Sequence, residues 1–194
     1  MSPPPKRVFL LWLLLSFLAG SLLWASPPEL TELPQHPQPL SEPYYSFVID
    51  LCAQHHLPST YVLNLIWAES RNDPKAENWN YRWINTKTVT PAGKTKWIWR
   101  NLPVSWDRGF FQLNQDSLPD FSARYNGGKS IDPFDWKTNL RVGIAHLAYC
   151  RKMMGSMFGA VASMNMGERG YAEWLEGKRE MRYSTKRLLE LVFQ

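Results

Sequence analysis

The chain has 194 residues, of which 44% are hydrophobic and 14% aromatic, enough for one compact domain with its own core and additional segments. Its formal net charge is +5, but it has no block of lysine and arginine of the kind that binds nucleic acid, so we expect no nucleic-acid partner. A mildly basic chain instead suits an anionic wall polymer or a membrane surface. Two cysteines, Cys52 and Cys150, are too few for a disulfide scaffold, although one bridge stays open.

The first 25 residues have the pattern of an export signal. The chain is cationic up to Arg7, almost entirely apolar over residues 8–25, and rich in small residues directly afterwards. Residues 1–25 are therefore predicted to be a signal peptide or an N-terminal membrane anchor, which places the protein in the periplasm or on a membrane facing the cell wall. Leu23 is unfavourable for cleavage after Ala25, and the apolar run approaches the ~20 residues that span a bilayer, so both forms stay open.

Residues 26–43 are predicted to form a linker. They contain six prolines and few large apolar residues, which favours an extended and semi-rigid chain. At ~3.1 Å per residue, such a linker would hold the next domain tens of ångströms from a membrane. A folded domain is predicted over residues 44–194.

Two helices are predicted at the start of this domain. Apolar residues recur at helical spacing from Tyr45 to Cys52, and Leu57-Pro58 ends this first helix. Ser59 or Thr60 is predicted to cap the second helix.

The second helix carries a carboxylate on its apolar face. Val62, Leu65, Ile66 and Glu69 share this face because residues three and four apart lie above one another. A buried carboxylate is costly unless it is paired or protonated, so the pKa of Glu69 should be raised. A raised pKa is what a general acid needs near neutral pH. The alternative is that the helix ends near Ser70 and Glu69 points into solvent.

An aromatic-rich β-hairpin is predicted over residues 79–106. Tyr81, Trp83, Trp97 and Trp99 alternate along two runs that Pro91-Ala92-Gly93 separates. Aromatic rings can stack on the apolar faces of sugars, so Trp83 and Trp99 are predicted to bind a glycan. The alternative is that the rings form a small core of the hairpin itself.

The rest of the domain is predicted to be mainly helical. A polar loop around residues 126–128 precedes a long helix that Asp135 can cap, and this helix is apolar on two sides, which is typical of a central helix. Two further helices are predicted over residues 157–166 and 184–193, the first ended by Gly167 and Gly170. The predicted fold is mainly α with one inserted hairpin.

Three segments, in this order, resemble the catalytic domain of soluble lytic transglycosylases, the lysozyme-like family that cleaves bacterial peptidoglycan. Glu69-Ser70 matches the family's glutamate-serine motif, Gly109-Phe110-Phe111-Gln112 is similar to its glycine-leucine-methionine-glutamine motif, and Ser163-Met164-Asn165-Met166-Gly167 to its alanine-tyrosine-asparagine-alanine-glycine motif. The resemblance covers roughly Tyr44 to the C-terminus. It implies an α+β lysozyme-like fold with the hairpin inserted between the first and second motifs.

The resemblance also implies a reaction with one catalytic carboxylate, whereas ordinary glycoside hydrolysis uses two. Glu69 would protonate the oxygen between N-acetylmuramic acid and N-acetylglucosamine, and then accept the proton of the muramic C6 hydroxyl as a 1,6-anhydro ring closes. No metal or cofactor is implied. The partner is the peptidoglycan glycan strand, and the chain is expected to be a monomer. The residues expected to bind the glycan or line its cleft are Ser70, Phe110, Phe111, Gln112 and Asn165.

Two departures from the family leave alternatives open. Met164 replaces a tyrosine whose hydroxyl helps to position the catalytic glutamate in the family, and a thioether cannot donate a hydrogen bond. Either Tyr183 or another tyrosine substitutes, or the protein is a catalytically weak glycan-binding wall protein. Asp107, two residues before Gly109, is a possible second carboxylate that would make the protein a hydrolysing muramidase, as in goose-type lysozymes. The favoured reading is that Asp107 pairs with Arg108 or caps a turn.

A metal site is a further alternative. Cys52 lies close to His55 and His56, and His146 precedes Cys150 by one helical turn, so two helices could present two Cys/His pairs to a zinc ion. Such spacing is common by chance. A disulfide between the two cysteines, or two buried thiols, is the favoured prediction.

Overall fold

The computed structural model describes residues 39–194. The predicted export segment and most of the predicted linker lie outside the described residues. The described residues belong to one compact unit, Pro37–Gln194. Within the described range, no helix combines the length and the apolar character that a membrane crossing requires.

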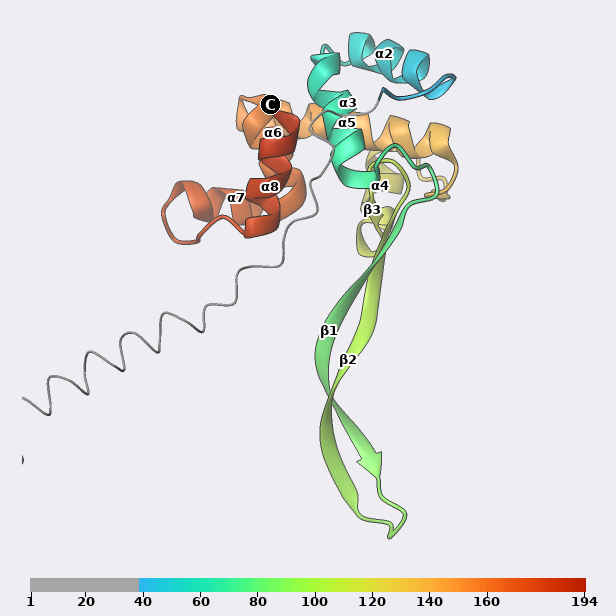
Figure 1. Ribbon diagram of the computed structural model, residues 1–194, viewed down its shortest axis with the longest axis vertical. Helices are drawn as coiled ribbons and strands as arrows, with labels where there is room; N and C mark the ends of the chain where they lie inside the picture. Colours follow the sequence, from blue (N-terminus) through green and yellow to red (C-terminus); the bar gives the residue numbers. More distant parts are fainter. Residues whose placement is uncertain (1–38) are drawn as a thin grey trace, which may run out of the picture. The chain divides into compact units, whose positions relative to one another are not determined.

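The described residues form seven α-helices and one three-stranded antiparallel sheet (Figure 1). This is the mainly helical α+β fold that the sequence predicts. In chain order the elements are α2 (Tyr44–Gln54), α3 (Ser59–Ser70), β1 (Glu77–Val89), β2 (Thr95–Arg108), β3 (Leu113–Asn114), a 3-10 turn (Gln115–Ser117), α4 (Leu118–Tyr125), α5 (Trp136–Met154), α6 (Met157–Met166), α7 (Glu168–Leu175) and α8 (Tyr183–Val192).

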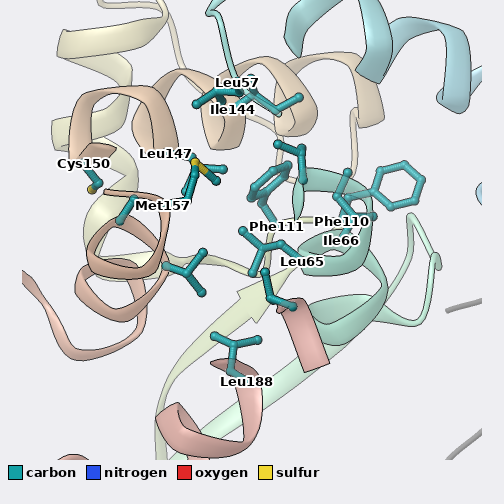
Figure 2. Packing of buried hydrophobic residues seen from close by; sticks show 14 of the residues in the cluster. Leu57, Leu65, Ile66, Phe110, Phe111, Ile144, Leu147, Cys150, Met157 and Leu188 are labelled. Atoms are coloured by element: carbon teal, nitrogen blue, oxygen red, sulfur yellow. The ribbon is translucent and has the colours of Figure 1, made fainter. Parts of the chain in front are cut away.

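Helix α5 lies at the centre of the hydrophobic core, as its two apolar sides predict. Leu140, Val142, Ile144 and Leu147 are all 0% exposed, although they point in different directions around the helix. Figure 2 shows Ile144 beside Leu57, and Leu147 in the same cluster as Leu65 of α3, Phe111 of the turn after β2 and Met157 of α6. Leu40, from the segment predicted as linker, is also buried in this core.

Helix α3 buries the face that the sequence predicts. Val62, Leu65 and Ile66 are at most 1% exposed. The predicted cap is wrong, because the N-cap is Pro58 and both Ser59 and Thr60 already lie within the helix.

Strands β1 and β2 form the predicted hairpin, with the turn over residues 90–94. They pair along their whole length, from Glu77 opposite Arg108 to Val89 opposite Thr95, with one irregularity between Asn80 and Tyr81. The short strand β3 pairs only with the base of β2. Figure 1 shows the rest of this two-stranded ribbon extending beyond the helices.

Two features of the helical part differ from the prediction. Helix α4 was not predicted, and Gly170 lies inside helix α7 instead of ending the preceding helix. Gly170 is buried, and a Cβ atom there would lie 3.0 Å from the Arg179 guanidinium. A glycine at this position therefore permits close packing and does not break the helix.

Candidate active site

A cavity of about 580 Å³ lies between the base of the hairpin and the helices. It brings together Glu69, Asp107, Phe111, Gln112 and Asn165, five of the residues singled out from the sequence. They come from α3, β2, the turn after β2, and α6. The complete lining is Glu69, Asn80, Tyr81, Arg82, Val104, Ser105, Asp107, Phe111, Gln112, Asn114, Met164, Asn165 and Arg182.

Glu69 is half-buried in this cavity, one residue before the end of α3. It continues the buried stripe of the helix and does not swing into solvent. Burial raises the pKa of its carboxyl group to about 7, and the negative charge of Asp107 contributes to the same shift. A glutamate with this pKa is protonated in a large fraction of molecules at neutral pH, which permits it to act as a general acid.

Asp107 faces the cavity from strand β2. Its carboxylate accepts hydrogen bonds from the side-chain amides of Asn80, at 2.9 Å, and Asn114, at 2.7 Å. The predicted pairing with Arg108 is wrong, because neighbouring residues of a strand point to opposite faces. Arg108 instead pairs with Glu77 at 2.6 Å.

The turn that follows β2 places Phe111 and Gln112 on the cavity. Gln112 has a φ of 45°, a left-handed conformation that is uncommon outside glycine. Its Nε2 atom donates to the carbonyl oxygens of Gly109, at 2.7 Å, and Ala76, at 3.2 Å. Its Oε1 atom accepts from the Asn78 side chain. These bonds tie the turn to the start of β1.

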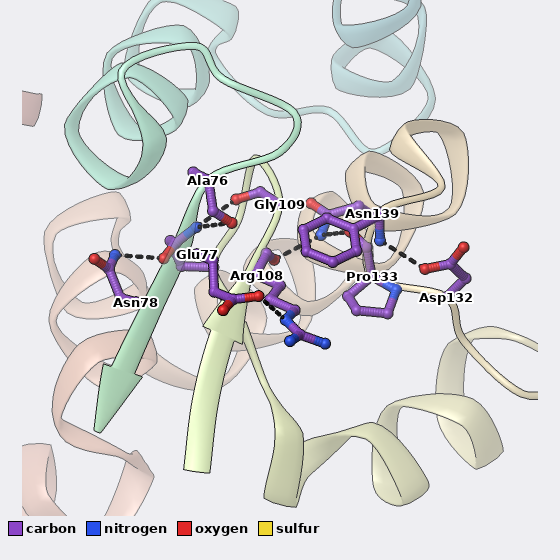
Figure 3. A network of polar contacts seen from close by, with 10 residues as sticks. Ala76, Glu77, Asn78, Arg108, Gly109, Asp132, Pro133 and Asn139 are labelled. Atoms are coloured by element: carbon purple, nitrogen blue, oxygen red, sulfur yellow. Dashed lines mark hydrogen bonds and ion pairs between the residues drawn. The ribbon is translucent and has the colours of Figure 1, made fainter. Parts of the chain in front are cut away.

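Asn139 of helix α5 holds the same turn from the other side (Figure 3). Its Oδ1 atom accepts from the Phe111 amide at 2.9 Å, and its Nδ2 atom donates to the carbonyl oxygens of Arg108 and Pro133, at 3.0 and 2.9 Å. A Cβ atom at Gly109, where φ is 75°, would lie 2.2 Å from this Nδ2 atom. The close approach of Asn139 therefore requires glycine at position 109.

Replacing Asn139 by alanine is expected to destabilise the fold by about 3 kcal/mol or more, because a fully buried side chain with three backbone partners is lost. Urea unfolding of Asn139→Ala measures this. Asn85→Ala, an exposed asparagine of the hairpin, is the control and should change stability by less than about 0.5 kcal/mol. Equal effects of the two substitutions would contradict the role of Asn139 as a clamp.

Asn165 is held in the cavity by helix α8. Its Oδ1 atom accepts a 2.6 Å hydrogen bond from the hydroxyl of Thr185, which is fully buried.

Met164 lines the cavity at the position where the motif of the resembling family has a tyrosine. Tyr183 does not replace that tyrosine, because it is 72% exposed and does not line the cavity. Burial and the charge of Asp107 are the causes of the raised Glu69 pKa, with no hydrogen bond to the carboxyl group among them.

Four of the predicted site residues do not line the cavity. Ser70 is buried and donates to the Ile66 carbonyl oxygen at 2.9 Å, the helix-end bond that was its alternative role. Phe110 is 0% exposed and packs in the core against the Tyr44 ring, at 5.0 Å between centroids, so only Phe111 forms a wall. Trp83 and Trp99 are 65% and 66% exposed along the hairpin and lie outside the cavity lining.

The sequence did not single out several polar residues of the cavity. They come from the face of the hairpin opposite to its aromatic residues, from strand β3 and from the residue before α8. Strand alternation could have found the first group, because Asn80 and Arg82 occupy the positions between Trp79, Tyr81 and Trp83. Nothing in the sequence marked Arg182.

Cys52 and Cys150 are both buried free thiols, so no bridge joins them. His146 lies beside Cys150, with 3.7 Å between Nε2 and Sγ, and its other ring nitrogen is 3.1 Å from the Tyr125 hydroxyl. Across the described range, 39–194, no three or more His, Cys, Asp or Glu side chains gather in a metal-binding arrangement. The two Cys/His segments therefore do not converge on a common site.

Comparison with known protein families finds one match. The model of the family described as "Transglycosylase SLT domain" matches residues 47–186. The matched range contains every residue of the cavity lining, from Glu69 to Arg182. No curated protein matches the sequence.

Proposed function

Because the chain belongs to the transglycosylase SLT domain family, which cleaves peptidoglycan, we propose that it is a lytic transglycosylase with Glu69 as its single catalytic residue. The bond cleaved is the β-1,4 linkage between N-acetylmuramic acid and N-acetylglucosamine. The observation that carries this proposal is the half-buried Glu69 carboxyl group, whose pKa is raised to about 7 within a polar cavity.

In this reaction Glu69 acts first as an acid and then as a base. Its protonated carboxyl group donates to the glycosidic oxygen, and the N-acetylglucosamine departs with a free 4-hydroxyl group. The resulting carboxylate accepts the proton of the muramic C6 hydroxyl, whose oxygen bonds to the anomeric carbon and closes the 1,6-anhydro ring. Water is not consumed. The cleft must hold the C6 hydroxyl in place so that it reacts faster than solvent, which is an effective-molarity effect.

The other residues of the cavity bind and orient the glycan. Asn165 presents a side-chain amide suited to the N-acetyl substituents, and Thr185 fixes its orientation. Gln112 supports the site indirectly, because its amide group is bonded within the turn that carries Phe111. Phe111 forms an apolar wall that keeps water from the reacting bond. The Asp107 carboxylate lies between two asparagine amides, and its negative charge helps to keep the proton on Glu69 and would stabilise the positive charge that develops at the anomeric carbon.

The setting of this enzyme is also part of the proposal. Residues 1–25 would export the chain or anchor it in a membrane, and residues 26–43 would link that segment to a catalytic domain over residues 44–194. The domain would act in the periplasm or at the membrane surface, as a monomer, on glycan strands of the wall.

A second candidate function is a hydrolysing muramidase, and the position of Asp107 favours it. Its carboxylate lines the same cavity as Glu69 and faces neither Arg108 nor a turn. A carboxylate there could activate a water molecule to attack the anomeric carbon, which gives a reducing end.

The products of digestion distinguish these functions. Residues 37–194 would be incubated with purified peptidoglycan, and the soluble products analysed by mass spectrometry. Products lighter by one water, with 1,6-anhydro ends, are expected from a lytic transglycosylase. Reducing ends would establish the hydrolase instead. Binding to peptidoglycan without either product would identify a glycan-binding protein and contradict both proposals.

Asp107→Asn is expected to shift the pH dependence of cleavage to lower pH. Removing the negative charge beside Glu69 makes its proton easier to lose, so the basic limb of the kcat/KM profile moves downward and the rate at pH 7 falls a few-fold. Asp116→Asn, an exposed acid close in sequence, should leave the profile unchanged. If Asp107→Asn lowered kcat/KM by more than about 100-fold at every pH, Asp107 would be a catalytic base.

A further inference from the structure

The exposed aromatic residues of the hairpin lie on one face of it. Residues directly opposite in an antiparallel pair share a face, and alternate residues of each strand do so as well. The register places Trp83 opposite Asn101, Asn85 opposite Trp99, and Lys87 opposite Trp97. We call this surface the aromatic face. Its exposed aromatic members, each 47–66% exposed, are Trp79, Tyr81, Trp83, Trp97 and Trp99.

The aromatic face is turned away from the cavity. The hairpin residues Asn80, Ser105 and Asp107 line the cavity, and they belong to the opposite face of the ribbon. Tyr81, beside the irregularity in the pairing, is the one aromatic member that also reaches the cavity lining. A glycan strand in the cavity therefore lies against the polar face, and its binding does not account for Trp97 and Trp99.

The aromatic face is too exposed to be a core of the hairpin. Trp97 and Trp99 are 61% and 66% exposed, although neighbouring rings on a ribbon can cover one another. Contiguous exposed apolar surface of this kind marks an interaction site.

Apart from its first and last residues, the hairpin carries positive charge only. Residues 78–106 contain no aspartate or glutamate. Their five cations are Arg82, Lys87, Lys94, Lys96 and Arg100. None of these five forms an ion pair with any other residue of the described range, 39–194. Lys87 belongs to the aromatic face and Lys94 to the turn at the tip, whereas Arg82, Lys96 and Arg100 belong to the opposite face. The tip of the hairpin, with Lys94 and Lys96, therefore complements an anionic partner.

The tip of the hairpin is aliphatic as well as cationic. Val89, which shares the aromatic face, is 66% exposed next to Pro91 and Ala92. Aliphatic side chains do not stack on sugars, but they enter the boundary between lipid headgroups and acyl chains. Tryptophan and tyrosine are enriched at the same boundary, and lysine and arginine are attracted to anionic lipids.

We propose that the aromatic face and the tip of the hairpin dock on the surface of an anionic lipid bilayer. The rings lie at the depth of the headgroups, and the lysines at the tip contact lipid phosphates. This contact is made by the folded domain, so it is independent of residues 1–25 and of the cleavage reaction.

Sedimentation with lipid vesicles tests the proposal. Residues 37–194, which form a compact unit of their own, are used so that the N-terminal segment cannot contribute. They should bind vesicles of equal parts phosphatidylglycerol and phosphatidylcholine, bind pure phosphatidylcholine at least about tenfold more weakly, and be released by salt.

Two paired variants locate the contact. The double variant Trp97→Ser/Trp99→Ser should bind the anionic vesicles at least about tenfold more weakly, and Lys94→Gln/Lys96→Gln should weaken binding mainly at low salt. Tyr45→Ser/Tyr183→Ser removes two exposed aromatic residues of the helices and should not change binding. All variants should keep the circular dichroism spectrum of the parent, because every replaced side chain is exposed.

Three results would overturn the proposal. One is the absence of binding to anionic vesicles at low salt. Another is equal binding by the tryptophan variant and its tyrosine control. The third is a tryptophan variant that loses binding to purified peptidoglycan while its vesicle binding is intact, which would make the aromatic face a glycan surface.

Discussion

Glu69→Gln is expected to lower the rate of peptidoglycan cleavage by about 10³-fold while peptidoglycan binding persists. Glutamine keeps the shape of the side chain but cannot give a proton to the glycosidic oxygen or take one from the C6 hydroxyl. The release of soluble fragments measures the rate, and co-sedimentation with the insoluble wall measures binding. Glu180→Gln, which replaces an exposed glutamate, should retain the parent rate. Undiminished cleavage by Glu69→Gln would remove Glu69 from the mechanism.

The same variant should be more stable than the parent at alkaline pH. The pKa of Glu69 rises from 4.5 to about 7 on folding, so the folded state holds its proton over this range and loses stability as pH rises through it. Glutamine carries no such penalty. Glu69→Gln should therefore match the parent near pH 4 and exceed it by up to about 3 kcal/mol at pH 8. Urea unfolding at the two pH values measures this difference, and a gain independent of pH would contradict the assigned cause.

Gly143→Ala is expected to destabilise the fold by about 3 kcal/mol or more and to disrupt the cavity. A Cβ atom at this position of the central helix α5 would lie 2.1 Å from Cγ of the Phe111 ring. Neither partner can move easily, because the helix is buried and the turn of Phe111 is held by Asn139. Phe111 also walls the cavity, so cleavage by the fraction that still folds should fall as well.

Thermal unfolding and the cleavage rate together check this prediction. Arg141→Ala, at an exposed position of the same helix, is the matched control and should change stability by less than about 0.5 kcal/mol. A folded and fully active Gly143→Ala protein would show that Phe111 can be displaced without consequence for the cavity.

Local periodicity was sufficient to predict most of the fold. The apolar spacing in α3 and α5 and the alternation of side chains in the hairpin each extend over a few residues. Such local patterns can be recognised in a single sequence. Helices α4 and α7 were missed because each has only eight residues, about two turns, and because each lies beside glycines, which favour loops.

The residues that line the cavity around Glu69 were harder to predict than Glu69 itself. Glu69 follows from the stripe of one helix, whereas the direction of Asp107 depends on the register of three strands. Phe110 and Phe111 are equivalent in the sequence, but the turn sends one ring into the core and the other into the cavity. The hydrogen bond from Thr185 to Asn165 joins helices α8 and α6, and no local sequence pattern predicts a contact between distant segments.

The cavity depends on contacts between distant parts of the chain. The Asn64 side chain donates to the Val192 carbonyl oxygen at 3.1 Å, across 128 residues of sequence, and α8 also orients Asn165. Contacts of such separation close large loops and form late in folding, whereas the hairpin can form early from its own turn. A chain still being made, or one that lacks its last helix, therefore has the hairpin but an incomplete cleft. The cleft is therefore complete only when α8 has packed against the rest of the domain.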